Sequence, residues 1–143
     1  MEGSSIKRLH LYQLTAIFSM LFALLGFSYN VWRMEVTEQN SNIRTASFEM
    51  LLILSSLEQL IYSAHYDGNL QEGNPRNGWV KVGLIADLSL LTTDSVNKQA
   101  ITLKGVWSEH WETMPDNRHS VELIVDAIDS TRSEIKQGLS SLH

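Results

Sequence analysis

Residues 9–32 read LHLYQLTAIFSMLFALLGFSYNVW and contain no Asp, Glu, Lys or Arg. A helix rises about 1.5 Å per residue, and about 20 predominantly apolar residues cross the hydrocarbon core of a bilayer. The run is therefore long enough to span a membrane once. Tyr12, Tyr29 and Trp32 lie near its two ends, where aromatic rings with polar atoms favour the lipid headgroups. The sequence predicts one transmembrane helix.

The main alternative is a cleaved signal peptide. Lys7 and Arg8 fit the basic start of such a peptide, but its apolar region is usually only about 7–15 residues long and ends in small residues. The run observed here is longer, and its best cleavage candidate, Gly26-Phe27-Ser28, is weak. A buried core helix of a soluble domain is a poorer fit, because the run is apolar on every side. We expect an uncleaved signal-anchor helix.

The basic residues that flank the run predict its orientation. Lys7 and Arg8 precede it closely, whereas Arg33 and Arg44 follow over a longer stretch that also contains acidic residues. Because Lys and Arg near a membrane segment favour the cytoplasmic side, residues 1–8 are expected in the cytoplasm. Residues 33–143 would then form a periplasmic or other extracytoplasmic domain on the inner membrane.

The composition of residues 33–143 limits the function. These residues carry nine Lys and Arg against fifteen Asp and Glu, a formal net charge of −6. An acidic surface does not suit nucleic acid, whose phosphates attract basic proteins. The chain contains no cysteine, which excludes a disulfide framework, a thiolate zinc site and a cysteine nucleophile. We predict no nucleic-acid partner, no cofactor and no metal site.

A periodic apolar stripe follows the membrane segment. No Gly or Pro occurs between Val31 and Tyr66, so the membrane helix is expected to continue as one helix to about Tyr66. Steps of three and four residues separate the stripe's members, which is the spacing of packed helices. They are Ile43, Ala46, Met50, Ile53, Leu57, Leu60 and Ala64, widened by Leu51, Leu54 and Ile61, with Glu49, Ser56 and Ser63 on the opposite face.

Three more helices are expected after a loop at residues 67–78. The mostly apolar segment Trp79–Leu91 is too short to span a bilayer and is interpreted as a buried core helix. Asp94 is expected to cap a third helix that Pro115 stops, and Asp116 or Asn117 to start a fourth. The predicted fold is all-α: an N-terminal transmembrane helix that continues into an antiparallel four-helix bundle.

The loop DGNLQEGNPRNG is longer than most connections between bundle helices, a mild indication of function. It departs from the calcium-loop pattern, since Glu72 replaces the required Gly and Gly78 stands where the bidentate Glu should be. Asn74 followed by Pro75 is a candidate helix start, and Asn77 is the competing cap.

Helices that alternate in direction would bring the loop and the turn at Met114–Asn117 to the same, membrane-distal end of the bundle. Tryptophan, histidine and charged side chains would converge there. We predict a recognition surface for a partner or ligand at Arg76, Trp79, His110, Trp111 and Glu112. The competing interpretation is structural, with the tryptophans as core and rim anchors and the polar residues as a solvated face.

The order of a membrane helix and four bundle helices resembles the outer domains of bacterial chemoreceptors and sensor kinases. Those receptors return through the membrane to an output domain, whereas no second apolar run follows here, so any signal is expected to pass through a partner. No G-x-S-x-G, glycine-rich phosphate loop or H-E-x-x-H pattern is present. We therefore predict a non-catalytic accessory, scaffold or interaction subunit that binds a protein partner or forms a homo-oligomer. The alternative is a small-ligand or metal-binding module that works through a partner.

Overall fold

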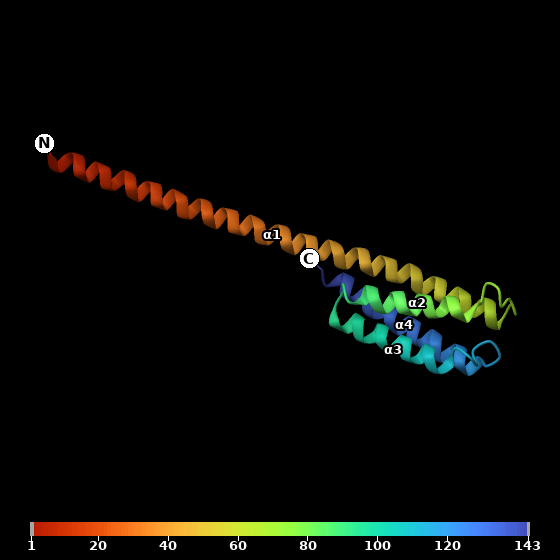
Figure 1. Ribbon diagram of the computed structural model, residues 1–143. Coiled ribbons are helices and arrows are strands. Elements are labelled where there is room, and N and C mark those ends of the chain that lie inside the picture. The colour runs from red at the N-terminus through yellow and green to blue at the C-terminus, as the bar shows by residue number, and fades with distance from the viewer. Residues whose placement is uncertain (1, 143) are drawn as a thin grey trace. The chain divides into compact units, whose positions relative to one another are not determined.

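The computed structural model describes residues 2–142, and side-chain burial for residues 8–142. Within these residues it contains four helices and no strand (Figure 1): α1 (Glu2–His65), α2 (Pro75–Ser89), α3 (Asp94–His110) and α4 (Arg118–Ser140). The predicted all-α class is confirmed. The chain divides into two compact units, Met1–Gln39 and Asn40–His143.

The first unit is an apolar helix, the N-terminal part of α1. Its large apolar side chains between Leu9 and Trp32 are each between 42 and 71% exposed. Among the described residues, α1 is the one helix that is long and apolar enough to cross a membrane, judged by length and composition. The prediction of a long apolar helix near the N-terminus is therefore confirmed.

The second unit is a helical bundle with one hydrophobic core. α3 packs against both α2 and α4, and hydrogen bonds join α1 to α2 and to α4. All four helices, and Met114 between α3 and α4, contribute to the core. Its buried members are Met50, Leu54, Leu57, Leu60, Ile61, Ala64, Val82, Ile85, Val96, Ala100, Leu103, Trp107, Met114, Val121, Ile124, Ile128 and Ile135.

The buried face of α1 is narrower than the predicted stripe. Leu54, Leu57 and Ile61 are fully buried, whereas Ile43 and Ile53 are only half-buried. Ile53, a member of the predicted stripe, packs against the core from its partly exposed edge.

The second helix begins and packs differently from the prediction. α2 starts at Pro75, with Asn74 as its cap: the Asn74 side chain accepts a hydrogen bond from the Arg76 amide. The Asn74–Pro75 start is confirmed. The interpretation as a wholly buried helix is wrong, because Val80 is 69% exposed and α2 buries one face only. The buried residues of α2 follow steps of four, three and four, the spacing of one helix face, and the opposite face remains exposed.

The third and fourth helices are bounded by capping side chains. Thr93, not Asp94, caps α3, and its side chain accepts from the Val96 amide. α3 ends at His110, earlier than Pro115, because residues 111–116 form hydrogen-bonded turns that carry Met114 into the core. Asn117 caps α4 by accepting from two amides of its first turn, which confirms one of the two predicted starts.

Candidate functional site

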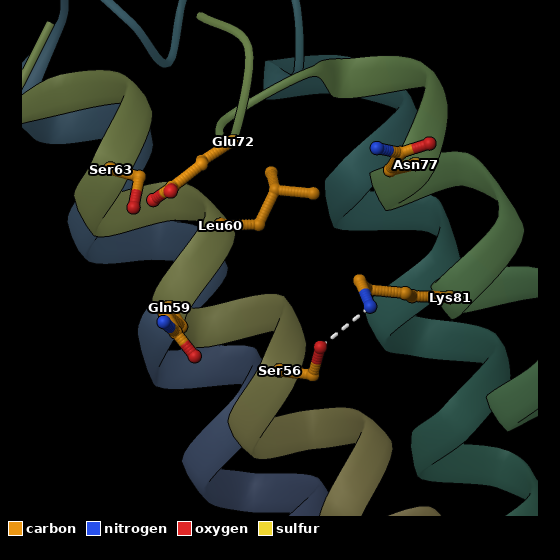
Figure 2. A pocket seen from close by; sticks show the side chains of 7 residues that line it. All are labelled: Ser56, Gln59, Leu60, Ser63, Glu72, Asn77 and Lys81. Carbon is orange, nitrogen blue, oxygen red and sulfur yellow. Dashed lines mark hydrogen bonds between the residues drawn. The ribbon is translucent and has the colours of Figure 1, made fainter. Parts of the chain in front are cut away.

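A polar cavity lies between α1, α2 and the loop that joins them (Figure 2). Its volume is about 280 Å³. α1 contributes residues spaced by three or four positions, which share one side of a helix. α2 adds two residues one turn apart, and the loop adds one. The lining residues are Ser56, Gln59, Leu60, Ser63, Glu72, Asn77 and Lys81.

The cationic side of the cavity is Lys81. Its Nζ donates a hydrogen bond to Ser56 Oγ over 2.6 Å, and the side chain is half-buried between α1 and α2. Among residues 8–142, the ion pairs involve Arg118 and Arg132, and none includes Lys81. The ammonium group of Lys81 therefore lines the cavity, and its hydrogen-bond partner is a hydroxyl group and not a carboxylate.

The anionic side is Glu72, an exposed residue of the loop whose backbone amide is held by Asn69. Asn69 Oδ1 accepts hydrogen bonds from the Gln71 and Glu72 amides. The next residue, Gly73, is buried against α1: a Cβ there would lie 2.5 Å from the Ala64 backbone nitrogen. The absence of a side chain at Gly73 thus lets the loop approach α1 closely. Figure 2 shows the Glu72 carboxylate beside Ser63, away from Lys81.

A second hollow of about 270 Å³ lies elsewhere on α1, beside the C-terminal end of α2. Its lining residues are Asn42, Thr45, Ala46, Glu49, Leu88 and Leu91. Leu91 is 57% exposed, and on α1 the side chains of Phe48 and Leu52, one turn apart, are 59 and 67% exposed. α1 and the segment that follows α2 therefore present apolar side chains to solvent.

The structure brings together part of the predicted recognition surface. The rings of Trp79 and Trp111 meet edge to face, with centroids 6.2 Å apart, and both residues are half-buried. Nδ1 of His110 lies 3.3 Å from the Ser120 hydroxyl at the start of α4. Arg76 and Glu112 are exposed, and neither belongs to an ion pair among the residues described.

His65 fastens the end of α1 to the α3–α4 connection. Its Nδ1 lies 3.1 Å from the Met114 carbonyl oxygen and 3.0 Å from that of Pro115. Because carbonyl oxygens only accept, Nδ1 carries the proton and donates. His65 therefore has a packing role. It brings the loop after α1 and the Met114–Pro115 turn to the same end of the bundle.

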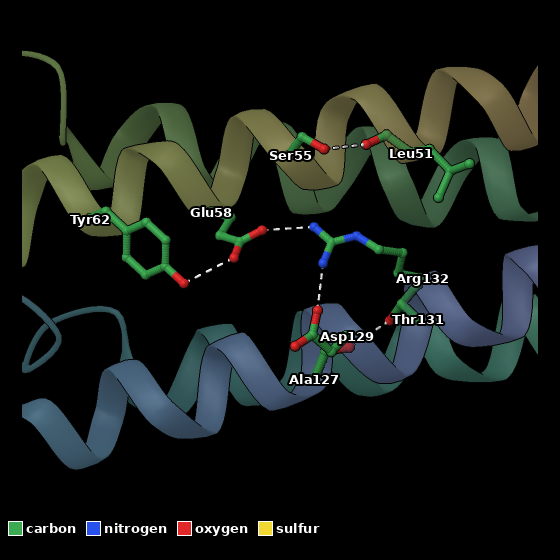
Figure 3. Close-up of polar contacts among 8 residues, drawn as sticks. All are labelled: Leu51, Ser55, Glu58, Tyr62, Ala127, Asp129, Thr131 and Arg132. Carbon is green, nitrogen blue, oxygen red and sulfur yellow. Dashed lines mark hydrogen bonds and ion pairs between the residues drawn. The ribbon is translucent and has the colours of Figure 1, made fainter.

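A charged network crosses from α1 to α4 (Figure 3). Arg132 Nη2 donates to Glu58 Oε2 over 2.7 Å, and the same guanidinium pairs with Asp129. Tyr62 donates its hydroxyl hydrogen to Glu58 Oε1 over 2.9 Å. The hydrogen bond from Arg132 holds the pKa of Glu58 below its ordinary value. The bond to Glu58 raises the pKa of Tyr62, because the phenol must remain protonated to donate.

The cavity is the feature that sequence reasoning missed. The sequence assigned Ser56 and Ser63 to the face opposite the core, but Ser56 is half-buried and Ser63 is only 5% exposed. That assignment is wrong, because α2 and the loop cover this side of α1. The available signal was the polar series Ser56, Gln59 and Ser63 at helical spacing beside the apolar stripe.

Comparisons of the chain with protein-family models, with curated proteins and with solved structures find no match. Within the described residues, no group of three or more His, Asp or Glu side chains is placed to hold a metal ion. The features of the molecule that bear on function are the two hollows, the exposed apolar side chains, and the charged residues Lys81 and Glu72.

Proposed function

We propose that this chain is a single-pass protein of the cell inner membrane, anchored by residues 9–32, whose bundle is a non-catalytic interaction subunit. Residues 1–8 lie in the cytoplasm and residues 33–143 on the other side. The bundle is an antiparallel four-helix domain. The contact of His65 with the α3–α4 connection, and the shared hollow of Asn42 with Leu91, support neighbouring helices of opposite direction.

The exposure of the apolar run carries the membrane part of this proposal. Each large apolar side chain from Leu9 to Trp32 is at least 42% exposed within a continuous helix. Exposing so large a contiguous apolar surface to water is unfavourable, and soluble proteins rarely do so. Contact with lipid tails removes this unfavourable exposure. Its backbone groups are satisfied inside the helix, as the bilayer core requires.

The exposed apolar side chains of the bundle support an interaction role. Phe48 and Leu52 on α1 and Val80 and Leu84 on α2 are each at least 45% exposed. We call these four residues the α1–α2 apolar face. We infer that they form one patch, since exposed apolar patches mark contacts with other proteins. The subunit binds a second polypeptide, either another protein or a further copy of itself, through this face.

Cysteine labelling tests the anchor and its orientation, because the chain has no cysteine of its own. Ser130 is exposed on α4, and Ser5 lies in the leading tail. In intact cells whose outer barrier is permeable, a membrane-impermeant maleimide should label Ser130→Cys but not Ser5→Cys. The protein should also stay with the membrane after carbonate extraction. Extraction into the soluble fraction, or the reverse labelling pattern, contradicts the proposal.

The protein mass in mild detergent tests the interaction role. Light scattering should give a complex heavier than the 16.2 kDa chain. Leu52→Asp with Leu84→Asp should reduce it to one chain, because an interface cannot bury unpaired charges cheaply. Ile101→Asp on α3 is the matched control, since Ile101 is 58% exposed and outside the face. A single chain in the unchanged protein would contradict the homo-oligomer.

The polar cavity favours a second candidate function. A concave site with one lysine and one glutamate, neither of them in an ion pair among residues 8–142, suits a small charged ligand. Such a ligand would bind where α1 meets α2, the two helices that also carry the α1–α2 apolar face. The protein would then be a small-ligand module that works through its partner.

A further inference from the structure

We propose that the cavity between α1, α2 and their loop binds a small ω-amino carboxylate, with its carboxylate at Lys81 and its ammonium group at Glu72. This inference rests on the second candidate function. It deepens that function by naming the class of ligand.

Lys81 brings a positive charge to the cavity wall. Its Nζ is held at the cavity wall by Ser56 Oγ, over 2.6 Å, and belongs to no ion pair among residues 8–142. An ammonium group carries three hydrogens. The bond to Ser56 uses one of them. A ligand carboxylate would accept another in a charge-assisted bond, which is stronger than a bond between neutral groups.

The other side of the cavity carries a negative charge. Glu72 lines the same cavity, and the two charged side chains approach it from different elements, α2 and the loop (Figure 2). A dicarboxylate would be repelled by Glu72, and a diamine by Lys81. A molecule with one charge of each sign has a partner for both. Because Glu72 and Lys81 do not pair with each other, the ligand must span the space between them.

The size and polarity of the cavity limit the ligand further. A cavity of about 280 Å³ falls just below the usual range for drug-sized ligands, which is roughly 300–1,000 Å³. Leu60 supplies an apolar side chain between the charged groups, as Figure 2 shows, and matches a short methylene chain. Gln59, Ser63 and Asn77 add amide and hydroxyl groups to the wall. A short chain with charges at its two ends fits this pattern.

Calorimetry on the full chain in detergent tests the proposal. The probes are glycine, β-alanine, γ-aminobutyrate and 5-aminovalerate, with butyrate and butylamine as single-charge controls. At least one of the longer dipolar probes should bind, and both controls should bind about tenfold more weakly or not at all, since each forms one charge-assisted contact in place of two. Absence of binding by all four dipolar probes overturns the proposal.

Charge reversal provides the sharper test. Glu72→Lys should lose the dipolar ligand and gain preference for succinate, whereas Lys81→Glu should gain preference for putrescine. Lys98→Glu and Glu109→Lys reverse exposed charges outside the cavity and should leave binding unchanged. If a reversed variant fails to fold by circular dichroism, Lys81→Met and Glu72→Gln replace it, each with an expected loss of about tenfold or more. Binding that persists in folded cavity variants overturns the proposal.

The outcomes also separate this inference from the proposed function. Membrane extraction, maleimide labelling and complex mass do not depend on the cavity charges. If those three measurements succeed and no dipolar probe binds, the ligand inference fails and the interaction subunit stands. If the chain is extracted as a soluble monomer that still binds the probes, the interaction role fails and the ligand site stands.

Discussion

Arg132 on α4 donates a hydrogen bond from Nη2 to Oε2 of Glu58 on α1, over 2.7 Å, and so joins two helices whose residues are 74 positions apart in the chain. Both side chains are 23% exposed, and Tyr62 donates to the second oxygen of Glu58. One carboxylate thus accepts from two side chains at once. This contact fixes how α4 is turned relative to α1.

The pH dependence of stability should report this contact. The Arg132 hydrogen bond lowers the folded-state pKa of Glu58 below its ordinary 4.5. The contact therefore stabilises the fold fully above that unfolded value, and its contribution is lost as pH falls through the lower folded pKa. Chemical denaturation of the protein and of Glu58→Gln should differ at pH 7 and converge in acid. A difference that stays constant with pH would contradict the assignment.

Tyr62 should act at the opposite end of the pH range. Its bond to Glu58 raises the folded-state pKa above 10.0, so this contribution is present below pH 10 and is lost as pH rises through the raised value. Tyr62→Phe removes the phenol hydroxyl. Above pH 10, the free energy of unfolding of this variant should therefore fall less steeply with pH than that of the unchanged protein. Tyr66→Phe is the matched control, because Tyr66 is exposed and its hydroxyl donates to no carboxylate among the residues described.

Two glycines of α2 should respond to alanine in opposite directions. A Cβ at Gly78 would lie 2.1 Å from the Trp107 ring atom Cζ2, inside a fully buried contact. Gly78→Ala should therefore destabilise the bundle by about 1–3 kcal/mol, the range for overpacked cores. Gly83 has no atom within 4 Å of its virtual Cβ, so Gly83→Ala should stabilise the helix by about 0.5–1 kcal/mol. Thermal unfolding by circular dichroism measures both, and equal effects would refute this packing.

Substitutions at two leucines of α1 should distinguish the core from the α1–α2 apolar face. Leu57 is fully buried, and Leu57→Ala should cost about 2–5 kcal/mol through lost burial and the cavity left behind. Leu52 is 67% exposed, and Leu52→Ala should change stability by no more than about 0.5 kcal/mol. Denaturant unfolding of both variants tests the rotation of α1. A large effect at Leu52 would place the core on the other side of this helix.

The second unit should fold without the apolar helix. Its buried side chains come from Asn40–His143 alone, so a fragment of residues 40–143 contains the whole core. We expect helical circular dichroism and one cooperative melt, because isolated helices are marginal in water and only joint packing stabilises them. A fragment that melts gradually, or shows β-structure, would disprove the independent fold.

Of the two candidate sites, the tryptophan pair could be predicted from the sequence and the polar cavity could not. Convergence of Trp79 and Trp111 followed from helix lengths and alternating directions, and the structure places their rings in contact. The polar cavity could not be predicted in this way. Glu72 reaches it because Gly73 lies against Ala64, a contact that depends on the path of a loop and not on a periodic pattern.

The sequence by itself determined the class of the chain, its long apolar N-terminal helix and several helix starts. These depend on the length of an apolar run, on a period of 3.6 residues and on caps such as Asn74 and Asn117, all of which are local. Tertiary structure alone decided the rotation of each helix. That rotation buried Leu54 fully and Ile53 only partly, left Val80 exposed, and paired Glu58 with Arg132. The physical reason is that a helix with apolar residues on several sides has several possible buried faces, and only the shape and charge of its neighbours select one.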